Sequence, residues 1–431
     1  MIPKDASPER AIRLRYGKGE VAFRGGPGWR LQPVGAPERT AVDPAELLGR
    51  ALARPVGSPG LKALASEAGS VVVSIPDTTR PPVARRVLGL IVAEILSAGV
   101  RPEDVTIFVA SGVHSAVGEA ALRDLAGGGL PPGIKIVQND ARTPSDFRLV
   151  ATTSRGTPIL VNRVVLEAGL NVIVSPTAFH YFAGMGGGRK MVVPGASSHD
   201  TVKANHRLSL TPTGQMHPGC RSGNLEGNPV HEDMMEGMQA SLKRAFLVNL
   251  VLDGLAEIAD IVCGDAAESY LEAVRRAKRM LEIRLPGPCD VAVASAGGHP
   301  LDIDLIQAHK SIDHAAAAVR DGGAVIALAE CSAGVGSDTF LPWFDLGSAA
   351  AISARLASDY RLNGQTALSL MKKLERLKII LVSALDPSVV ERTGITPARD
   401  LDEAVALAGC CVDQAPLCYV MPAAWGILPV V

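Results

Sequence analysis

Runs rich in Val and Ile alternate with stretches of helical period along most of this chain. The helical stretch 83–99 places Leu88, Ile91 and Ile95 on one face and ends at Gly99. Strand, helix and strand in this order predict parallel sheets with right-handed crossovers. The runs that predict buried strands are 71–75, 105–110, 159–161, 172–175, 246–252, 291–295, 324–329 and 379–383.

The pattern breaks once, at residues 285–289. An Arg- and Lys-rich helical stretch over 268–281 ends there, Pro286, Gly287 and Pro288 follow, and a new buried strand begins. We therefore expect two α/β domains with mainly parallel sheets and an active site in the cleft between them. Residues 1–284 would form the first domain and 285–410 a smaller second one. Residues 411–431 would be a tail that could return to the first domain.

Charge and composition exclude several classes of partner. The 431 residues carry a formal net charge of -1, so neither a nucleic acid nor an anionic membrane surface is expected to bind. No apolar run reaches 18 residues, and the start, Met1 to Arg10, lacks an apolar signal core, which predicts a cytoplasmic protein. The seven cysteines form no CxxC pair, so neither a zinc ribbon nor a disulfide framework is indicated.

The densest chemistry lies in residues 175–206, directly after a predicted strand. Here His180 is followed by Gly184, Gly186, Gly187 and Gly188 and then by Lys190. Glycines allow a backbone to approach a ligand closely, and ligands bind at the carboxyl edge of such sheets. Arg189 and Met191 exclude both the phosphate-binding P-loop and the dinucleotide fingerprint, because each motif requires other residues at these positions.

Histidines surround this glycine segment. Ser198 can cap a helix that would carry His199 and His206 on one face, seven residues apart. Imidazole binds zinc, copper, iron and nickel, and the spacing does not choose among these metals. The alternative for each histidine taken alone is a surface position or a satisfied core position.

Other polar residues follow predicted strands. Asp77 and Arg80 come after 71–75, and His114 comes after 105–110, so all three are expected at the same sheet edge. Arg80 could hold a carboxylate or phosphate bidentately. The structural alternative for Asp77 or Thr79 is a helix cap.

A second pair lies further along the chain, at Gln307 and Lys310. If residues 299–310 are helical, the two side chains share a face, because they are three residues apart. A solvated surface lysine is the alternative for Lys310.

Taken together, these segments resemble the nickel-pincer nucleotide lactate racemase family. The resemblance covers about residues 70–312 and is weak over the last ~120 residues. The most specific part of the resemblance is the glycine–lysine segment together with the Asn-His pair at 205–206. The matching motifs are D-x-T-R-P at 77–81, G-x-H at 112–114, H-x-F-A-G-x-x-G-G-R-K at 180–190, P-G at 194–195, N-H at 205–206, R-x-G-N-L at 221–225, V-L-D at 251–253, G-G-x-P-L-D at 297–302 and Q-A-x-K at 307–310.

The resemblance implies a role for each matching residue. Lys190 would carry the nickel-pincer nucleotide through a thioamide, and His206 would supply the remaining nickel ligand. His114 and His180 would act as acid and base on opposite sides of the substrate. The implied binding residues are Asp77, Thr79, Gly187 and Gly188 for the cofactor, and Arg80, Gln307 and Lys310 for the substrate carboxylate.

Elementary chemistry agrees with these roles. The α-proton of a 2-hydroxy acid is weakly acidic, whereas loss of hydride gives a flat 2-keto acid if a base takes the hydroxyl proton. Two histidines then serve the two enantiomers, and a histidine pKa suits proton exchange near neutral pH. We therefore expect a 2-hydroxy acid racemase or epimerase whose partners are its substrate and the enzymes that build the cofactor, with a homo-oligomer as a further possibility.

The predicted pocket wall departs from that of the lactate enzymes of this family. Ile306 and His299 stand where those enzymes carry tyrosine, Ser115 replaces an arginine, and Gln365 replaces a tryptophan. These changes predict a substrate more polar than lactate, such as malate or a sugar acid, although lactate is not excluded.

Two other functions remain open from the sequence. One is a zinc or iron hydrolase or lyase that uses His114, His180 and His206 as its metal ligands. The other is a non-catalytic protein that binds a sugar acid or a nucleotide.

Overall fold

The computed structural model describes residues 11–37 and 42–431. Residues 1–10, on which the expectation of no signal sequence rested, lie outside the described residues. The chain forms two compact units. The central unit contains the described part of Glu38–Ser209 together with Gly219–Arg279. The terminal unit contains the described residues up to Pro37, Leu210–Pro218 and Met280–Val431.

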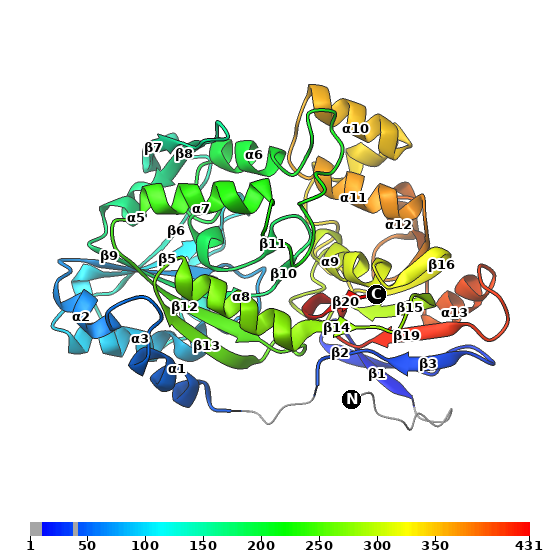
Figure 1. The fold of residues 1–431 in the computed structure, drawn as a ribbon, viewed down its shortest axis with the longest axis horizontal. Coiled ribbons are helices and arrows are strands. Elements are labelled where there is room, and N and C mark those ends of the chain that lie inside the picture. Colours follow the sequence, from blue (N-terminus) through cyan, green and yellow to red (C-terminus); the bar gives the residue numbers. More distant parts are fainter. Residues whose placement is uncertain (1–10, 38–41) are drawn as a thin grey trace. The chain divides into compact units, whose positions relative to one another are not determined.

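A six-stranded sheet with the order β13-β12-β9-β4-β5-β6 organises the central unit (Figure 1). All neighbouring strands in it are parallel except the edge strand β13, which is antiparallel to β12. The strands are β4 (Val71–Pro76), β5 (Val105–Ala110), β6 (Lys135–Gln138), β9 (Leu170–Thr177), β12 (Ala245–Leu252) and β13 (Ile258–Gly264). Strands β4, β9 and β12 are almost continuously buried, as their unbroken apolar runs predicted.

Helices and short strand pairs complete the central unit. The predicted strand 159–161 is part of β8, which pairs antiparallel with β7 outside the large sheet. The short pairs are β7 (Phe147–Thr152) with β8 (Pro158–Asn162) and β10 (Phe179–His180) with β11 (Gly184–Met185). The helices are α1 (Pro44–Ala53), α2 (Leu61–Ser66), α3 (Arg85–Ser97), η1 (Pro102–Asp104), α4 (Glu119–Leu125), η2 (Pro144–Asp146), α5 (Arg163–Glu167), η3 (Gly188–Met191), α6 (His199–Arg207), α7 (Pro229–Ser241) and α8 (Glu268–Leu281).

The terminal unit has a second six-stranded sheet, in the order β18-β17-β16-β15-β19-β3, and every neighbouring pair in it is parallel. Its strands are β3 (Arg30–Pro33), β15 (Cys289–Ser295), β16 (Val319–Leu328), β17 (Lys378–Val382), β18 (Thr396–Ala398) and β19 (Leu417–Met421). Two smaller pairs are β1 (Ile12–Tyr16) with β2 (Gly19–Phe23) and β14 (Glu282–Arg284) with β20 (Leu428–Val430). The predicted α/β class with mainly parallel sheets is therefore confirmed.

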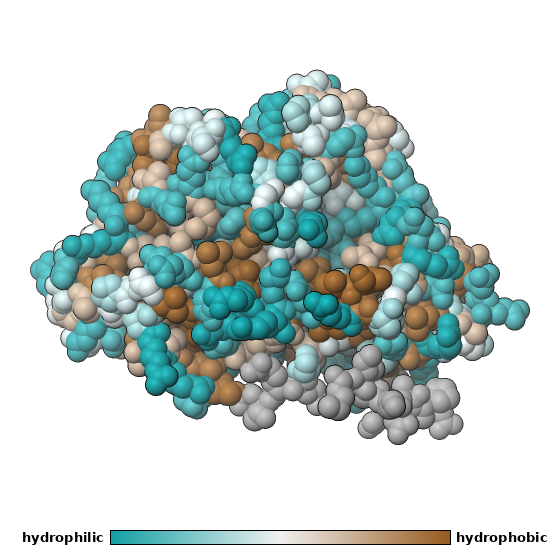
Figure 2. Space-filling view, in the orientation of Figure 1, coloured by the Kyte–Doolittle hydropathy of each residue, from teal (hydrophilic) through white to brown (hydrophobic). Residues whose placement is uncertain are grey.

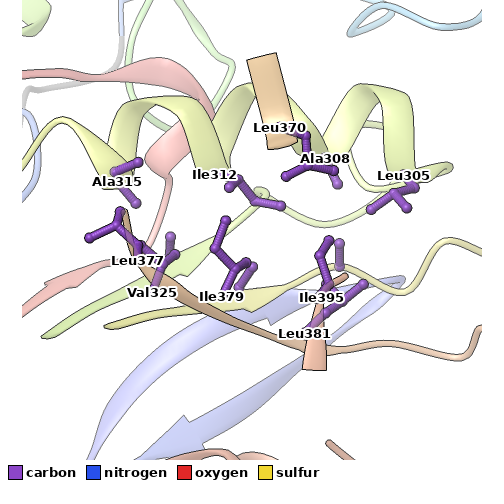
Figure 3. Packing of buried hydrophobic residues seen from close by; sticks show 14 of the residues in the cluster. Leu305, Ala308, Ile312, Ala315, Val325, Leu370, Leu377, Ile379, Leu381 and Ile395 are labelled. Atoms are coloured by element: carbon purple, nitrogen blue, oxygen red, sulfur yellow. The ribbon is translucent and has the colours of Figure 1, made fainter. Parts of the chain in front are cut away.

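Apolar side chains cover both faces of this second sheet. Along β15, Val291 and Val293 pack into one cluster, and Ala292 and Ala294 pack into the other, because successive strand residues point to opposite faces. Figure 3 shows one face, where Ile312 on α9 packs over strand residues such as Ile379. The helices of this unit are α9 (Leu305–Ala316), η4 (Leu341–Leu346), α10 (Ala349–Ser358), α11 (Gly364–Leu374), α12 (Pro387–Arg392), α13 (Leu401–Gly409) and η5 (Ala424–Gly426).

The two units divide the chain differently from the predicted domains. The described residues up to Pro37 were assigned to the first domain, but β3 pairs with β19, and Leu14 and Phe23 lie in a core cluster of the terminal unit. The tail, residues 411–431, is part of the terminal unit, where β19 lies between β15 and β3 and β20 pairs with β14. Short strands whose partners lie hundreds of residues away leave no local sign in the sequence.

Hydrophilic and apolar side chains are interspersed over the face shown in Figure 2. The large apolar side chains that stay exposed belong to separate elements within each unit. Leu90 lies on α3, Leu149 on β7 and Leu271 on α8 in the central unit, and Leu346 lies on η4 in the terminal unit. Within residues 11–37 and 42–431, no helix combines the length and the apolar character needed to cross a membrane.

Candidate active site

The carboxyl ends of β4, β5 and β9 lie side by side at one edge of the central sheet, because β4 pairs in parallel with both other strands. The chain continues from β4 to β5 and β6 on one side, and later adds β9 and β12 on the other side. Ligands bind at such a reversal of strand order in open α/β sheets. The segments with Asp77, His114 and His180 leave the sheet here, as the sequence predicted.

His114 forms a close pair with Asp77. Its Nδ1 lies 2.5 Å from Oδ2 of Asp77, and Oδ1 of the same carboxylate accepts hydrogen bonds from the hydroxyl and the backbone N–H of Thr79. Burial raises the pKa of Asp77, but the hydrogen bond and charge of His114, the charge of Arg80 and the Thr79 hydroxyl together lower it to about 2. An ionised Asp77 requires that His114 donates from Nδ1, which leaves Nε2 able to accept a proton.

The glycine segment forms the β10–β11 hairpin and then the turn η3. Gly187 and Gly188 both have positive φ, at 75° and 51°. A Cβ on Gly187 would lie 2.6 Å from the carbonyl oxygen of Pro176, and one on Gly188 would lie 2.5 Å from the ring of Tyr270. The N–H of Gly188 donates to Ser175 Oγ at 2.9 Å. Close internal packing thus explains both glycines, and their contact with a cofactor stays a prediction.

Phe182 is the centre around which three predicted site residues gather. Its ring centroid lies 4.6 Å from that of His180 and 5.0 Å from that of His206, both in edge-on geometry. The Nζ atom of Lys190 lies 5.5 Å from the same centroid. The hairpin, η3 and α6 therefore bring His180, Lys190 and His206 to one buried aromatic ring.

His206 is held as a neutral imidazole with a defined orientation. Burial, together with the nearby charges of Lys190 and His114, lowers its pKa to about 3. Its Nδ1 lies 3.2 Å from Oδ1 of Asn205, whose amide NH₂ donates to Asp233 at 2.8 Å. Because the amide is oriented by Asp233, His206 donates from Nδ1 and its Nε2 lone pair remains for a ligand.

His206 and Lys190 have the chemistry to hold a metal-bearing cofactor. The described residues contain no group of three or more His, Cys, Asp or Glu side chains that could hold a metal ion together. A neutral His206 beside the primary amine of Lys190 instead suits a cofactor that brings most of its own metal ligands and is attached to the chain. The residues present therefore fit the group that the resemblance implies.

Gln307 and Lys310 lie on α9 in the terminal unit. Asp304 caps this helix by accepting from the N–H of Gln307, and the Nζ of Lys310 donates to Oε1 of Gln307 at 2.6 Å. The predicted shared face is therefore confirmed. Since the amide oxygen accepts from the lysine, the remaining polar atoms of the pair are donors, which are the groups that a carboxylate binds.

Four residues of this centre had no predicted role. Phe182, Arg189, Asp233 and Tyr270 contact or support the predicted site residues. Phe182 and Arg189 lie inside the recognised glycine–lysine motif, so the motif itself was a signal for them. Asp233 on α7 and Tyr270 on α8 lie in separate helical stretches, and no local pattern marks their contacts.

The fold and the site define an α/β enzyme with histidines and a lysine at the carboxyl edge of a parallel sheet. The sequence matches the lactate racemase N-terminal domain over residues 16–217 and the lactate racemase C-terminal domain over residues 286–428. The chain belongs to the lactate racemase family, and it is accordingly an isomerase of the racemase type. The hydrolase, lyase and non-catalytic alternatives are therefore wrong.

Relatives and solved structures agree with this family. The chain is 29% identical to lactate racemase of Thermoanaerobacterium thermosaccharolyticum, over 95% of this chain and 97% of the relative. It is 28% identical to lactate racemase of Lactiplantibacillus plantarum, over 89% and 90% of the two chains. The structure resembles the lactate racemase apoprotein of T. thermosaccharolyticum with a TM-score of 0.87, covering 98% of this chain and 100% of that one. A Thermotoga maritima protein at 16% identity, with a TM-score of 0.65, shares the fold alone.

Proposed function

We propose that this protein racemises or epimerises a 2-hydroxy acid with a nickel-pincer nucleotide attached to Lys190. The observation that carries the proposal is the neutral His206, whose Nε2 lone pair is preserved by Asn205, beside Lys190 at the ring of Phe182. When bound, the group supplies an electron-poor acceptor for hydride from C2 of the substrate. His206 would hold its nickel, and the amine of Lys190 would hold its ring.

The other residues bind substrate and move protons. His114, with Nδ1 bonded to Asp77, presents Nε2 as a base for the hydroxyl proton of one enantiomer, and His180 serves the other enantiomer. Arg80 and the donors of Gln307 and Lys310 would bind the carboxylate. Asp77, Thr79, Gly187 and Gly188 would support the nucleotide. The further partners of this proposal are the enzymes that build the cofactor, and a cytoplasmic location goes with it.

Intact-mass measurement of protein produced together with the maturation enzymes tests the attachment site. We expect an adduct of nucleotide size with one nickel, and both Lys190→Ala and Lys190→Arg should lack it, because a thioamide needs a primary amine. Lys203→Arg is the matched control, since Lys203 is an exposed lysine on α6. An adduct that persists in Lys190→Arg would contradict the proposal.

We further propose that the substrate is more polar than lactate. The basis is the replacement of expected aromatic or basic wall residues by Ile306, His299, Ser115 and Gln365. Gln365 is buried, and its Oε1 accepts from the hydroxyl of Tyr360 at 3.1 Å, so it is a fixed polar group. Sites with fixed polar groups reject substrates that leave them unpaired.

A panel of single-enantiomer 2-hydroxy acids, followed by chiral chromatography, tests the substrate. We expect a higher kcat/KM for malate or a sugar acid than for lactate, the substrate named for the two relatives. Gln365→Trp should shift the preference toward lactate. A higher kcat/KM for lactate than for every polar acid would exclude the polar substrate while leaving the racemase proposal intact.

A further inference from the structure

Arg189 is a buried cation without an acidic partner. It is fully buried, and among the described residues the group that favours its charge is the hydroxyl of Tyr270 rather than a carboxylate. Its guanidinium donates to the hydroxyl of Tyr270 and lies over that ring, 4.7 Å from the centroid, while Nε has no hydrogen-bond partner. A buried charge of this kind costs stability compared with an apolar side chain of similar size. A role in the site would explain why a guanidinium occupies this position.

The backbone acceptors of Arg189 indicate that role. Its Nη2 donates to the carbonyl oxygen of Ala183 at 2.8 Å, and its Nη1 contacts that of Gly187 at 3.4 Å. The N–H of Ala183 in turn donates to Nδ1 of His180 at 3.3 Å, and the N–H of Lys190 donates to the oxygen of Gly187 at 3.1 Å. One planar guanidinium therefore fixes the two backbone positions that hold His180 and Lys190.

The bond from Ala183 determines which nitrogen of His180 carries the proton. Because Nδ1 accepts from a backbone N–H, a neutral His180 must carry its hydrogen on Nε2. His114 has the reverse arrangement, since its Nδ1 donates to Asp77 and its Nε2 is the acceptor. The two histidines are thus held in opposite tautomers by different partners.

We propose that Arg189 is a positioning residue that, by fixing Ala183, keeps His180 in the Nε2-protonated tautomer, opposite to that of His114. This inference rests on the proposed function, in which both histidines face the substrate. An Nε2–H on His180 can donate a hydrogen bond to a substrate oxygen, while Nε2 of His114 accepts the hydroxyl proton. The resting enzyme is then prepared for one enantiomer and must change its proton arrangement before it accepts the other.

The tautomers can be read without cofactor or activity, by ¹⁵N nuclear magnetic resonance of the histidine-labelled apoprotein. His180→Gln and His114→Gln assign the two signals. We expect the Nε2–H pattern for His180 and the Nδ1–H pattern for His114 in the wild type. Arg189→Met should give a tautomer mixture at His180 and leave His114 unchanged. An Nδ1–H tautomer of His180 in the wild type, or an unmixed Nε2–H tautomer in Arg189→Met, would overturn the proposal.

Two further measurements separate positioning from loss of folding. Arg189→Lys keeps the charge but lacks the planar group that reaches both carbonyls, so it should show the same mixture even if Arg189→Met does not fold. A wild-type His180 pattern in Arg189→Lys would also overturn the proposal. Tyr270→Phe removes only the hydroxyl and should keep the wild-type pattern, because the bond to Ala183 remains.

The kinetic consequence is specific to a racemase. The equilibrium constant of racemisation is one, so kcat/KM must be equal in the two directions, and an asymmetry can appear only in kcat with a compensating KM. We expect different kcat values for the two enantiomers in the wild type and a smaller difference in Arg189→Lys. Equal kcat values in the wild type would contradict the proposal. An absent Lys190 adduct, by contrast, would contradict the proposed function and leave the tautomer result standing.

Discussion

Asp77 and His114 are 37 positions apart in the sequence, yet Oδ2 of the aspartate lies 2.5 Å from Nδ1 of the histidine. The contact exists because β4 and β5, which end at Pro76 and Ala110, are parallel neighbours. The family resemblance implied that Asp77 contacts the nucleotide. The hydrogen bonds of its side chain go to His114 and Thr79, and its contact with a nucleotide stays a prediction.

Replacement of Asp77 by Asn should therefore impair proton transfer. An amide would no longer enforce the Nδ1-protonated tautomer of His114, and the comparable change in hydrolytic triads costs on the order of 10⁴-fold in kcat. We expect a loss of at least ~10²-fold in racemisation with the Lys190 adduct retained, measured by chiral chromatography and intact mass. Asp140→Asn, at an exposed aspartate that bonds Thr143, is the control and should leave turnover unchanged.

The same carboxylate makes stability depend on pH. The folded-state pKa of Asp77 is about 2, below its ordinary value near 3.8, so its stabilising effect is complete above about pH 4 and is lost as the pH falls toward 2. The wild type should exceed Asp77→Asn by up to about 2 kcal/mol in the free energy of unfolding at pH 6. Urea unfolding at several pH values measures this difference. A difference that stays constant from pH 6 to pH 2.5 would contradict it.

Alanine substitutions of the three site histidines should have different effects on turnover and on nickel binding. His114→Ala or His180→Ala should each reduce racemisation by at least ~10²-fold, the usual scale of acid–base catalysis, while nickel and the adduct remain bound. His206→Ala should lose or weaken nickel, as measured by metal analysis of the purified protein. His199→Ala is the matched control, because His199 lies seven residues earlier on α6 and its side chain is 41% exposed. Near-normal turnover in both His114→Ala and His180→Ala would exclude the two-histidine scheme.

A methyl group at Gly188 should destabilise the central unit. The backbone has φ 51°, and the added Cβ would lie 2.5 Å from the Tyr270 ring, so both strain and a clash result. We expect Gly188→Ala to lower the free energy of unfolding by about 2 to 4 kcal/mol in chemical denaturation. Gly89→Ala is the opposite control: Gly89 lies within α3 with open space around it, so alanine should stabilise by about 0.5 to 1 kcal/mol.

Local patterns predicted the sheets well. The runs 71–75 and 105–110 became β4 and β5, and Ser198 caps α6 by accepting from the N–H of Thr201. Strand composition and capping are decided by neighbours along the chain, so they are readable from the sequence. The run 159–161 was equally apolar, yet it pairs antiparallel in a small sheet, because pairing depends on which strand is adjacent in space.

The residue types of the site were predictable from the sequence, whereas the hydrogen bonds that support these residues were less so. The motif around Lys190 identified the residues that gather at Phe182, including His180 and His206. It did not identify Asp233, which orients the Asn205 amide, or Tyr270, which accepts from Arg189. Both lie on helices that reach the site only through the fold.

The position of β19 between β15 and β3 also affects the order in which the two units can fold during synthesis. Strand β3 ends at Pro33 and β19 begins at Leu417, so a ribosome must add about 380 residues between them. At roughly 5 to 20 residues per second, this takes about 20 to 80 s. During that interval the nascent β3 has no β19 to pair with, whereas every strand of the central sheet, up to the end of β13 at Gly264, is made within it. Vectorial synthesis thus favours completion of the central unit while the amino-terminal strands wait for the carboxyl-terminal segment to emerge.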